Sequence, residues 1–189
     1  MPRNILPEAA EKGTCLEPKL DPRLERLQRE IADATTGMTA EQWIRHPAGK
    51  WCAAEVLEHL YLTYTGTIKG FERVLAAGEP RHTGATWRQR VGKLVVLGFG
   101  HMPGGREAPA MARPKGIPPE KVRTEIAGKI DEMDDLIRQC EEKWGTRGPL
   151  MDHLILGPLS GAQWRKFHLV HGLHHVRQIR GLREASGVD

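Results

Sequence analysis

Apolar residues recur at the spacing of an α-helix in four long segments of this 189-residue chain. We expect helices over residues 21–36, 52–77, 118–144 and 160–185, because capping residues, prolines and glycines mark their ends. No strand pattern competes with this reading, since alternating apolar segments flanked by hairpin signals are absent. Residues 145–158 are therefore expected to be loop. The sequence predicts an all-α fold in which four long helices are joined by long loops.

The first 20 residues show neither helical nor strand periodicity. Prolines and glycines interrupt them at Pro2, Pro7, Gly13 and Pro18. Segments of this kind rarely contribute to a packed core. A chain of 189 residues is long enough for one well-packed core and short for two domains. We therefore expect an N-terminal tail over residues 1–20 and a single domain over residues 21–187.

Composition and charge exclude several classes of function. The net charge is +4, but Lys and Arg alternate with Asp and Glu instead of forming a basic run, so we expect no nucleic-acid partner. No apolar segment is long enough for a membrane span or a signal peptide. The three cysteines lack a framework spacing, which indicates free thiols in a reducing, cytoplasmic compartment. One charged face of the third predicted helix is expected to face solvent: Glu132, Asp134, Asp135, Arg138, Glu141 and Glu142.

Histidine is concentrated in the predicted helix over residues 160–185. Four of the nine histidines fall within eight residues, at His168, His171, His174 and His175. On a helix, His171 and His175 lie one turn apart on one face, so both imidazoles can bind the same metal ion. His168 and His175 are about 10 Å of helix rise apart and cannot share an ion. His171 is thus the central candidate, with His175 as its partner and His168 as the alternative partner.

The face that carries these histidines is expected to point inward, because it also carries Trp164 and Leu182. Adjacent buried imidazoles need partners that offset their desolvation, and a metal ion is one such partner. His59 flanks the apolar stripe of the predicted helix over 52–77, and a bundle can place it near the other histidines. A core-packing role for Trp164 and an ordinary helix hydrogen bond for Gln178 remain open. The candidate pocket or outer residues are His168, His153, Trp164 and Gln178.

Three short motifs follow one another in the chain: Trp51-Cys-Ala-Ala-Glu55-Val-Leu-Glu-His59-Leu, His153-x-x-x-Gly157-Pro158-Leu159, and Gln163-Trp164-x-x-Phe167-His168-x-x-His171-x-x-His174-His175-x-x-Gln178-Ile179. Taken in this order, they resemble the DinB-like superfamily and especially its DUF1569 branch. The resemblance covers about residues 20 to 185. One departure concerns the loop, where the family commonly has proline directly after the histidine that corresponds to His153. Leu154 stands there in this chain.

The resemblance implies a DinB-like four-helix bundle in which His59, His171 and His175 bind a divalent metal ion. Zinc, nickel and iron are the metals that the family commonly holds. Three protein ligands leave one coordination position open, as in catalytic metal sites. A metal ion with an open position can activate a water molecule or a thiol. The proline- and glycine-rich residues 81–119 are expected to wall the mouth of this site, with Trp51 or Trp164 lining the pocket.

Two hypotheses of function follow. The first is a metal-dependent enzyme, either a hydrolase or a transferase that acts with a low-molecular-weight thiol such as bacillithiol, mycothiol or glutathione. The alternative is a non-catalytic metal-binding or stress-response protein, because no carboxylate is obviously placed as a general base. Glu55 precedes His59 by one turn, but a charged residue there is expected at the surface. The expected partner is a small molecule, and a homodimer remains open.

Overall fold

The computed structural model describes residues 19–103 and 107–185. Residues 1–18 of the predicted N-terminal tail lie outside the described residues. The first helix, α1 (Pro22–Thr35), begins where the sequence predicts. The Asp21 carboxylate accepts the backbone N–H of Arg23 at 2.9 Å, and Pro22 occupies the first turn, where a missing N–H costs nothing. The buried face of α1 is formed by Leu24, Leu27, Ile31, Ala34 and Thr35.

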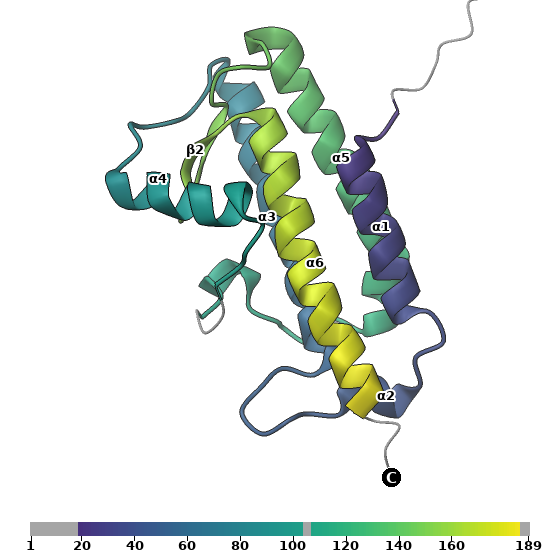
Figure 1. Ribbon diagram of the computed structural model, residues 1–189. Coiled ribbons are helices and arrows are strands. Elements are labelled where there is room, and N and C mark those ends of the chain that lie inside the picture. The colour runs from purple at the N-terminus through teal and green to yellow at the C-terminus, as the bar shows by residue number, and fades with distance from the viewer. Residues whose placement is uncertain (1–18, 104–106, 186–189) are drawn as a thin grey trace, which may run out of the picture.

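Three further long helices complete a bundle with α1: α3 (Ala53–Ala77), α5 (Pro119–Trp144) and α6 (Gly161–Ala185). α3 packs against α5 and α6, while α1 packs mainly against α6 (Figure 1). Gly78, which ends α3, has φ +74°, a left-handed conformation that favours glycine. Fully buried side chains at the centre include Leu57, Leu60, Tyr64, Ile130, Met133 and Ile179. The predicted all-α bundle is confirmed, and no described helix is long and apolar enough to cross a membrane.

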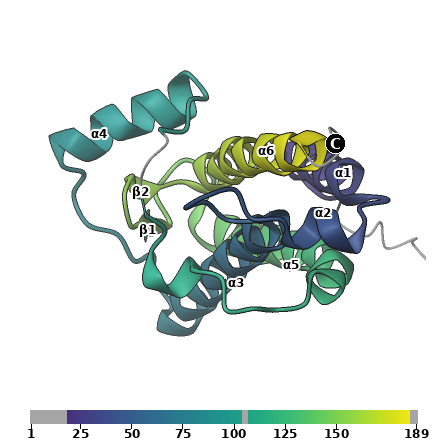
Figure 2. The ribbon, with the colours of Figure 1, turned by 90° about the horizontal axis from the view of Figure 1, so that it is seen from below.

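Shorter elements lie between the long helices. α2 (Ala40–Ile44) starts with the capping box of Thr39 and Gln42. α4 (Trp87–Lys93) runs into η1 (Leu94–Gly98), a π-helical turn, and this pair lies beside the bundle rather than within it (Figure 2). η2 (Ala110–Ala112) is a single 3-10 turn that contacts α3. Residues 104–106 of the same connection lie outside the described part of the chain.

The expectation that residues 145–158 form only loop is wrong. β1 (Met151–His153) and β2 (Gly157–Leu159) form an antiparallel hairpin, with Met151 opposite Leu159. Strands of three residues are too short to show an alternating pattern, so no periodic signal marks them. The turn is closed by the His153 ring, whose Nδ1 accepts the N–H groups of Ile155 and Leu156, both at 3.1 Å.

The expectation that the charged face of α5 is fully solvent-facing is also wrong. Asp134 is only 2% exposed, and its carboxylate accepts from Nε of Arg165 on α6 at 2.5 Å. Glu141 accepts from Nη1 of the same arginine at 2.7 Å, and the other Asp134 oxygen accepts the backbone N–H of Asp21 at 2.9 Å. A buried arginine requires such partners, because an unpaired charge away from water is costly. This cluster joins α5, α6 and the start of α1.

Candidate metal centre

Three histidines from two helices meet between α3 and α6. Nε2 of His171 lies 3.3 Å from Nε2 of His59 and 3.1 Å from Nε2 of His175. One ligand atom from each residue lies within 4.8 Å of the other two. The helical repeat places His171 and His175 one turn apart on α6, and the packing of α3 on α6 brings His59 to the same point. The structure thus assembles the three residues that the sequence and the resemblance single out.

Hydrogen bonds fix which nitrogen of two of these rings carries the proton. Nδ1 of His59 lies 2.7 Å from the carbonyl oxygen of Ala112, and Nδ1 of His175 lies 2.7 Å from Oε1 of Gln178. Because both oxygens only accept, each Nδ1 is the donor, and in a neutral ring Nε2 then carries the lone pair. The lone pairs of His59 and His175 therefore point at the region that Nε2 of His171 also faces. A single proton on His171 cannot satisfy this arrangement as well as a cation can.

Burial keeps the three rings in the form that binds metals. Burial lowers the pKa of His59 below its usual value of 6.5. For His171, burial together with the neighbouring imidazoles of His175 and His59 lowers the pKa well below that value. Burial and the nearby His59 lower the pKa of His175 to about 3. All three imidazoles are therefore neutral at pH 7, which is the state that ligates divalent metals.

A buried glutamate holds the loop that supports His59. Glu58 is 1% exposed, and its carboxylate accepts the backbone N–H groups of Lys115, Gly116 and Ile117 at 2.6, 3.0 and 3.1 Å. This loop follows directly after η2, whose Ala112 carbonyl accepts from His59. Glu58 therefore anchors the backbone that orients the neighbouring histidine. Sequence reasoning missed this role, because the partners of Glu58 lie 57 to 59 residues further along the chain.

The alternative in which His168 replaces His175 is not what the structure shows, because His168 lies outside the cluster of ligand atoms. His168 is fully buried, stacks on Trp164 at 5.8 Å between ring centroids, and contacts the edge of Tyr64. Neither of its ring nitrogens has a hydrogen-bond partner, and burial lowers its pKa to about 3. His168 thus forms part of the apolar packing behind the candidate centre.

The other predicted outer residues take three different places. His153 lies in the hairpin, packed against Phe167 at 4.2 Å between ring centroids, and burial lowers its pKa to about 4. Trp164 donates from Nε1 to the carbonyl of Met151 at 3.3 Å and otherwise packs in the core. Gln178 contacts a candidate ligand directly, through its hydrogen bond to His175. Of the three, only Gln178 has a hydrogen bond to a histidine of the cluster.

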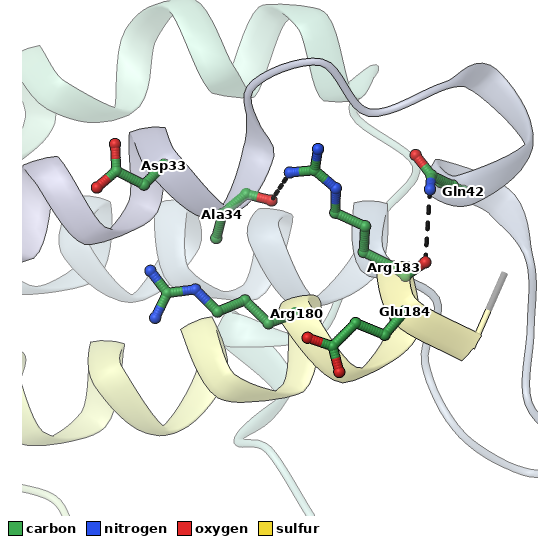
Figure 3. A pocket seen from close by; sticks show the side chains of 6 residues that line it. All are labelled: Asp33, Ala34, Gln42, Arg180, Arg183 and Glu184. Atoms are coloured by element: carbon green, nitrogen blue, oxygen red, sulfur yellow. Dashed lines mark hydrogen bonds between the residues drawn. The ribbon is translucent and has the colours of Figure 1, made fainter. Parts of the chain in front are cut away.

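Trp51 and one turn of residues 81–119, both predicted to line the site, lie near the cluster. The ring centroids of Trp51 and His59 are 5.2 Å apart. The turn η2, which falls within residues 81–119, contacts α3, the helix that carries His59. Trp164 lies deeper, among the aromatic rings behind the centre. A surface pocket of about 400 Å³ lies elsewhere, where the ends of α1 and α6 meet α2 (Figure 3). Its lining residues are Asp33, Ala34, Gln42, Arg180, Arg183 and Glu184, and none of them is a candidate ligand.

The fold and the site together define a helical bundle with a three-histidine cluster between two of its helices. Residues 21–181 match the family described as "Protein of unknown function (DUF1569)", and the chain belongs to this family. The resemblance to the DUF1569 branch that the sequence motifs indicate is thereby confirmed. Searches of curated proteins and of solved structures found no match.

Proposed function

We propose that this protein is a metal-dependent enzyme of the DinB-like superfamily, of the thiol S-transferase or hydrolase type. His59, His171 and His175 would hold a zinc, nickel or iron ion. The observation that carries the proposal is the convergence of three Nε2 atoms, two of them fixed as lone-pair donors by Ala112 and Gln178. When bound through three protein ligands, the ion would act as a Lewis acid at its remaining position, lowering the pKa of a water molecule or a thiol.

The residues around the cluster would orient the ligands and limit access of water. Ala112 and Gln178 hold the rings of His59 and His175 in the tautomer that presents Nε2. Trp51 covers one side of His59 with an apolar ring. The proposed partner is a low-molecular-weight thiol, which fits a cytoplasmic, reducing compartment in which Cys52 and Cys140 stay free. A homodimer is compatible with this proposal and is not required by it.

One observation favours the alternative of a non-catalytic metal-binding protein. The two carboxylates of α3 nearest the cluster are both occupied: Glu55 pairs with His46 and the backbone of Cys52, and Glu58 accepts three backbone N–H groups. Neither is free to act as a general base toward a substrate. A catalytic function would therefore depend on the ion lowering the pKa of the water molecule or thiol that it binds.

Metal analysis of protein purified without an affinity tag tests the proposal. The wild-type protein should retain a divalent transition metal, and His171→Gln should lose it, because His171 contacts both other ligands. His82→Gln, at an exposed histidine away from the cluster, is the matched control and should retain the metal. The metal-loaded protein should then conjugate a small thiol to an electrophile, or hydrolyse an activated ester, faster than His171→Gln does.

Equal metal content in wild-type protein and His171→Gln would refute the site. Metal binding without turnover in either assay would favour the non-catalytic alternative.

A further inference from the structure

A second group of metal-ligating side chains meets where α3 begins. His46, Cys52 and Glu55 each place one ligand atom within 4.8 Å of the other two. His46 comes from the connection after α2, and the other two residues come from the N-cap and first turn of α3. None of these side chains belongs to the three-histidine cluster.

The hydrogen bonds of His46 are not compatible with a neutral ring alone. Its Nδ1 lies 2.9 Å from the carbonyl oxygen of Ile44, and its Nε2 lies 2.8 Å from Oε2 of Glu55. Both oxygens are acceptors, whereas a neutral imidazole has only one N–H. If Nδ1 donates to Ile44, the lone pair of Nε2 faces a carboxylate. A cation bound by both side chains would satisfy this contact.

Cys52 makes a metal ion a suitable occupant. Its side chain is 3% exposed, and burial raises the pKa of the thiol, so the sulfur stays protonated unless a cation replaces the proton. Thiolate, imidazole and carboxylate are all ligands of zinc, and the same set accepts Co²⁺. A thiolate and a carboxylate also neutralise the charge of a divalent ion, which three neutral imidazoles do not. The donor set and its geometry therefore fit a zinc-type ion.

We propose that His46, Cys52 and Glu55 form a second divalent-metal site, separate from the three-histidine centre. On binding, the metal–sulfur bond replaces the S–H bond of Cys52, and the proton is released to solvent. Cys52 lies seven residues, or about 10 Å of helix rise, before His59, and Glu55 lies four residues before it on the same helix. Trp51 directly precedes Cys52 in the chain, and its ring contacts the ring of His59. A metal ion in the second site would hold in place the segment that carries Trp51, which lines the three-histidine centre.

Cobalt binding distinguishes the two sites, because only the second contains sulfur. Tag-free, metal-free full-length protein is titrated with Co²⁺ while the near-ultraviolet thiolate-to-cobalt charge-transfer band and the bound metal are recorded. The wild-type protein should bind two ions per chain, and one of them should produce the band. Cys52→Ser should abolish the band and one bound ion. Serine is a good helix N-cap, so this variant should keep α3 intact.

Four further variants separate this proposal from the proposed function. Cys15→Ala and Cys140→Ala should retain the band, whereas His46→Gln should shift it to higher Co²⁺ concentration. His171→Gln should lose the ion without the band and keep the ion that produces it. Absence of a charge-transfer band in the wild-type protein, or its survival in Cys52→Ser, would overturn the second site. His46 and Glu55 would then be a simple imidazolium–carboxylate pair.

Discussion

Removing the Glu58 carboxylate tests whether this residue anchors the loop behind the candidate metal centre. Glu58→Ala deletes three hydrogen bonds to backbone N–H groups, at 2.6, 3.0 and 3.1 Å, from a side chain that is 1% exposed. Hydrogen bonds to a charged group contribute about 1.5 to 3 kcal/mol each. Because the released N–H groups can regain water at this partly buried loop, we take the lower end and expect a loss of about 3 to 5 kcal/mol. That is a large fraction of the stability of a typical domain, about 5 to 15 kcal/mol.

The same change should weaken metal binding, because the loop carries Ala112, which orients His59. Losing such an outer hydrogen bond typically reduces metal affinity about 10- to 100-fold. Urea unfolding measures the free energy of unfolding, and competition with a coloured chelator measures the affinity. Glu58→Gln should fall between wild type and Glu58→Ala, since one carbonyl oxygen remains. Glu72→Ala, at an exposed glutamate of the same helix, is the control and should change both quantities little. If Glu58→Ala has the same urea midpoint of unfolding as the wild-type protein, the anchoring role is refuted.

Three further predictions concern stability. Chelation of the bound metal should lower the melting temperature measured by circular dichroism without abolishing the fold, because binding and folding are linked but the bundle has its own apolar core; an unchanged melting temperature after verified removal of metal would count against this linkage. Burial holds the pKa of His168 at about 3 and that of His153 at about 4. As the pH falls, these two histidines are therefore protonated near the ordinary histidine pKa of 6.5 in the unfolded chain, but only at lower pH in the folded chain. The free energy of unfolding of the metal-free protein should therefore fall as pH decreases from about 6.5 to about 4, by about 1.4 kcal/mol per pH unit for each such histidine, and His168→Leu should reduce this slope; an equal slope in both proteins would contradict the assignment. Gly172→Ala should cost about 1 to 3 kcal/mol, since the added methyl group meets Leu27 and the hydroxyl of Tyr64. Gly128→Ala, in open space on α5, should be neutral or stabilising, and equal effects of the two substitutions in urea unfolding would show that Gly172 is not tightly packed.

The features that could be predicted from the sequence are those that repeat along a helix. The apolar spacing gave the four long helices, and Asp21 with Pro22 gave the start of α1. The i, i+4 spacing gave the pair of His171 and His175, because two residues one turn apart share a face whatever the tertiary structure. The convergence of His59 with this pair needed the packing of α3 on α6, which periodicity does not give; the expected bundle allowed it and the family resemblance implied it.

The features that the sequence did not reveal depend on partners far along the chain. Asp134 looks like part of a solvated face, and its burial follows from Arg165, 31 residues later. Glu58 looks like a surface glutamate, and its partners lie 57 to 59 residues away. In both cases the acidic side chain is buried because a distant donor reaches it. Periodicity reports which face of a helix is apolar but not which charged residues find such donors.

The separation of the candidate ligands along the chain has a consequence for the order of folding. His59 and His171 are 112 residues apart, so an unfolded chain pays a large loop-closure entropy to bring them together. A metal ion could at most bridge His171 and His175 before α3 and α6 have packed, and two imidazoles hold an ion less tightly than three. The three-ligand centre therefore exists only in chains that have already assembled the bundle. Added metal should therefore lower the unfolding rate far more than it raises the folding rate. The bound ion would mark chains that have reached the native state.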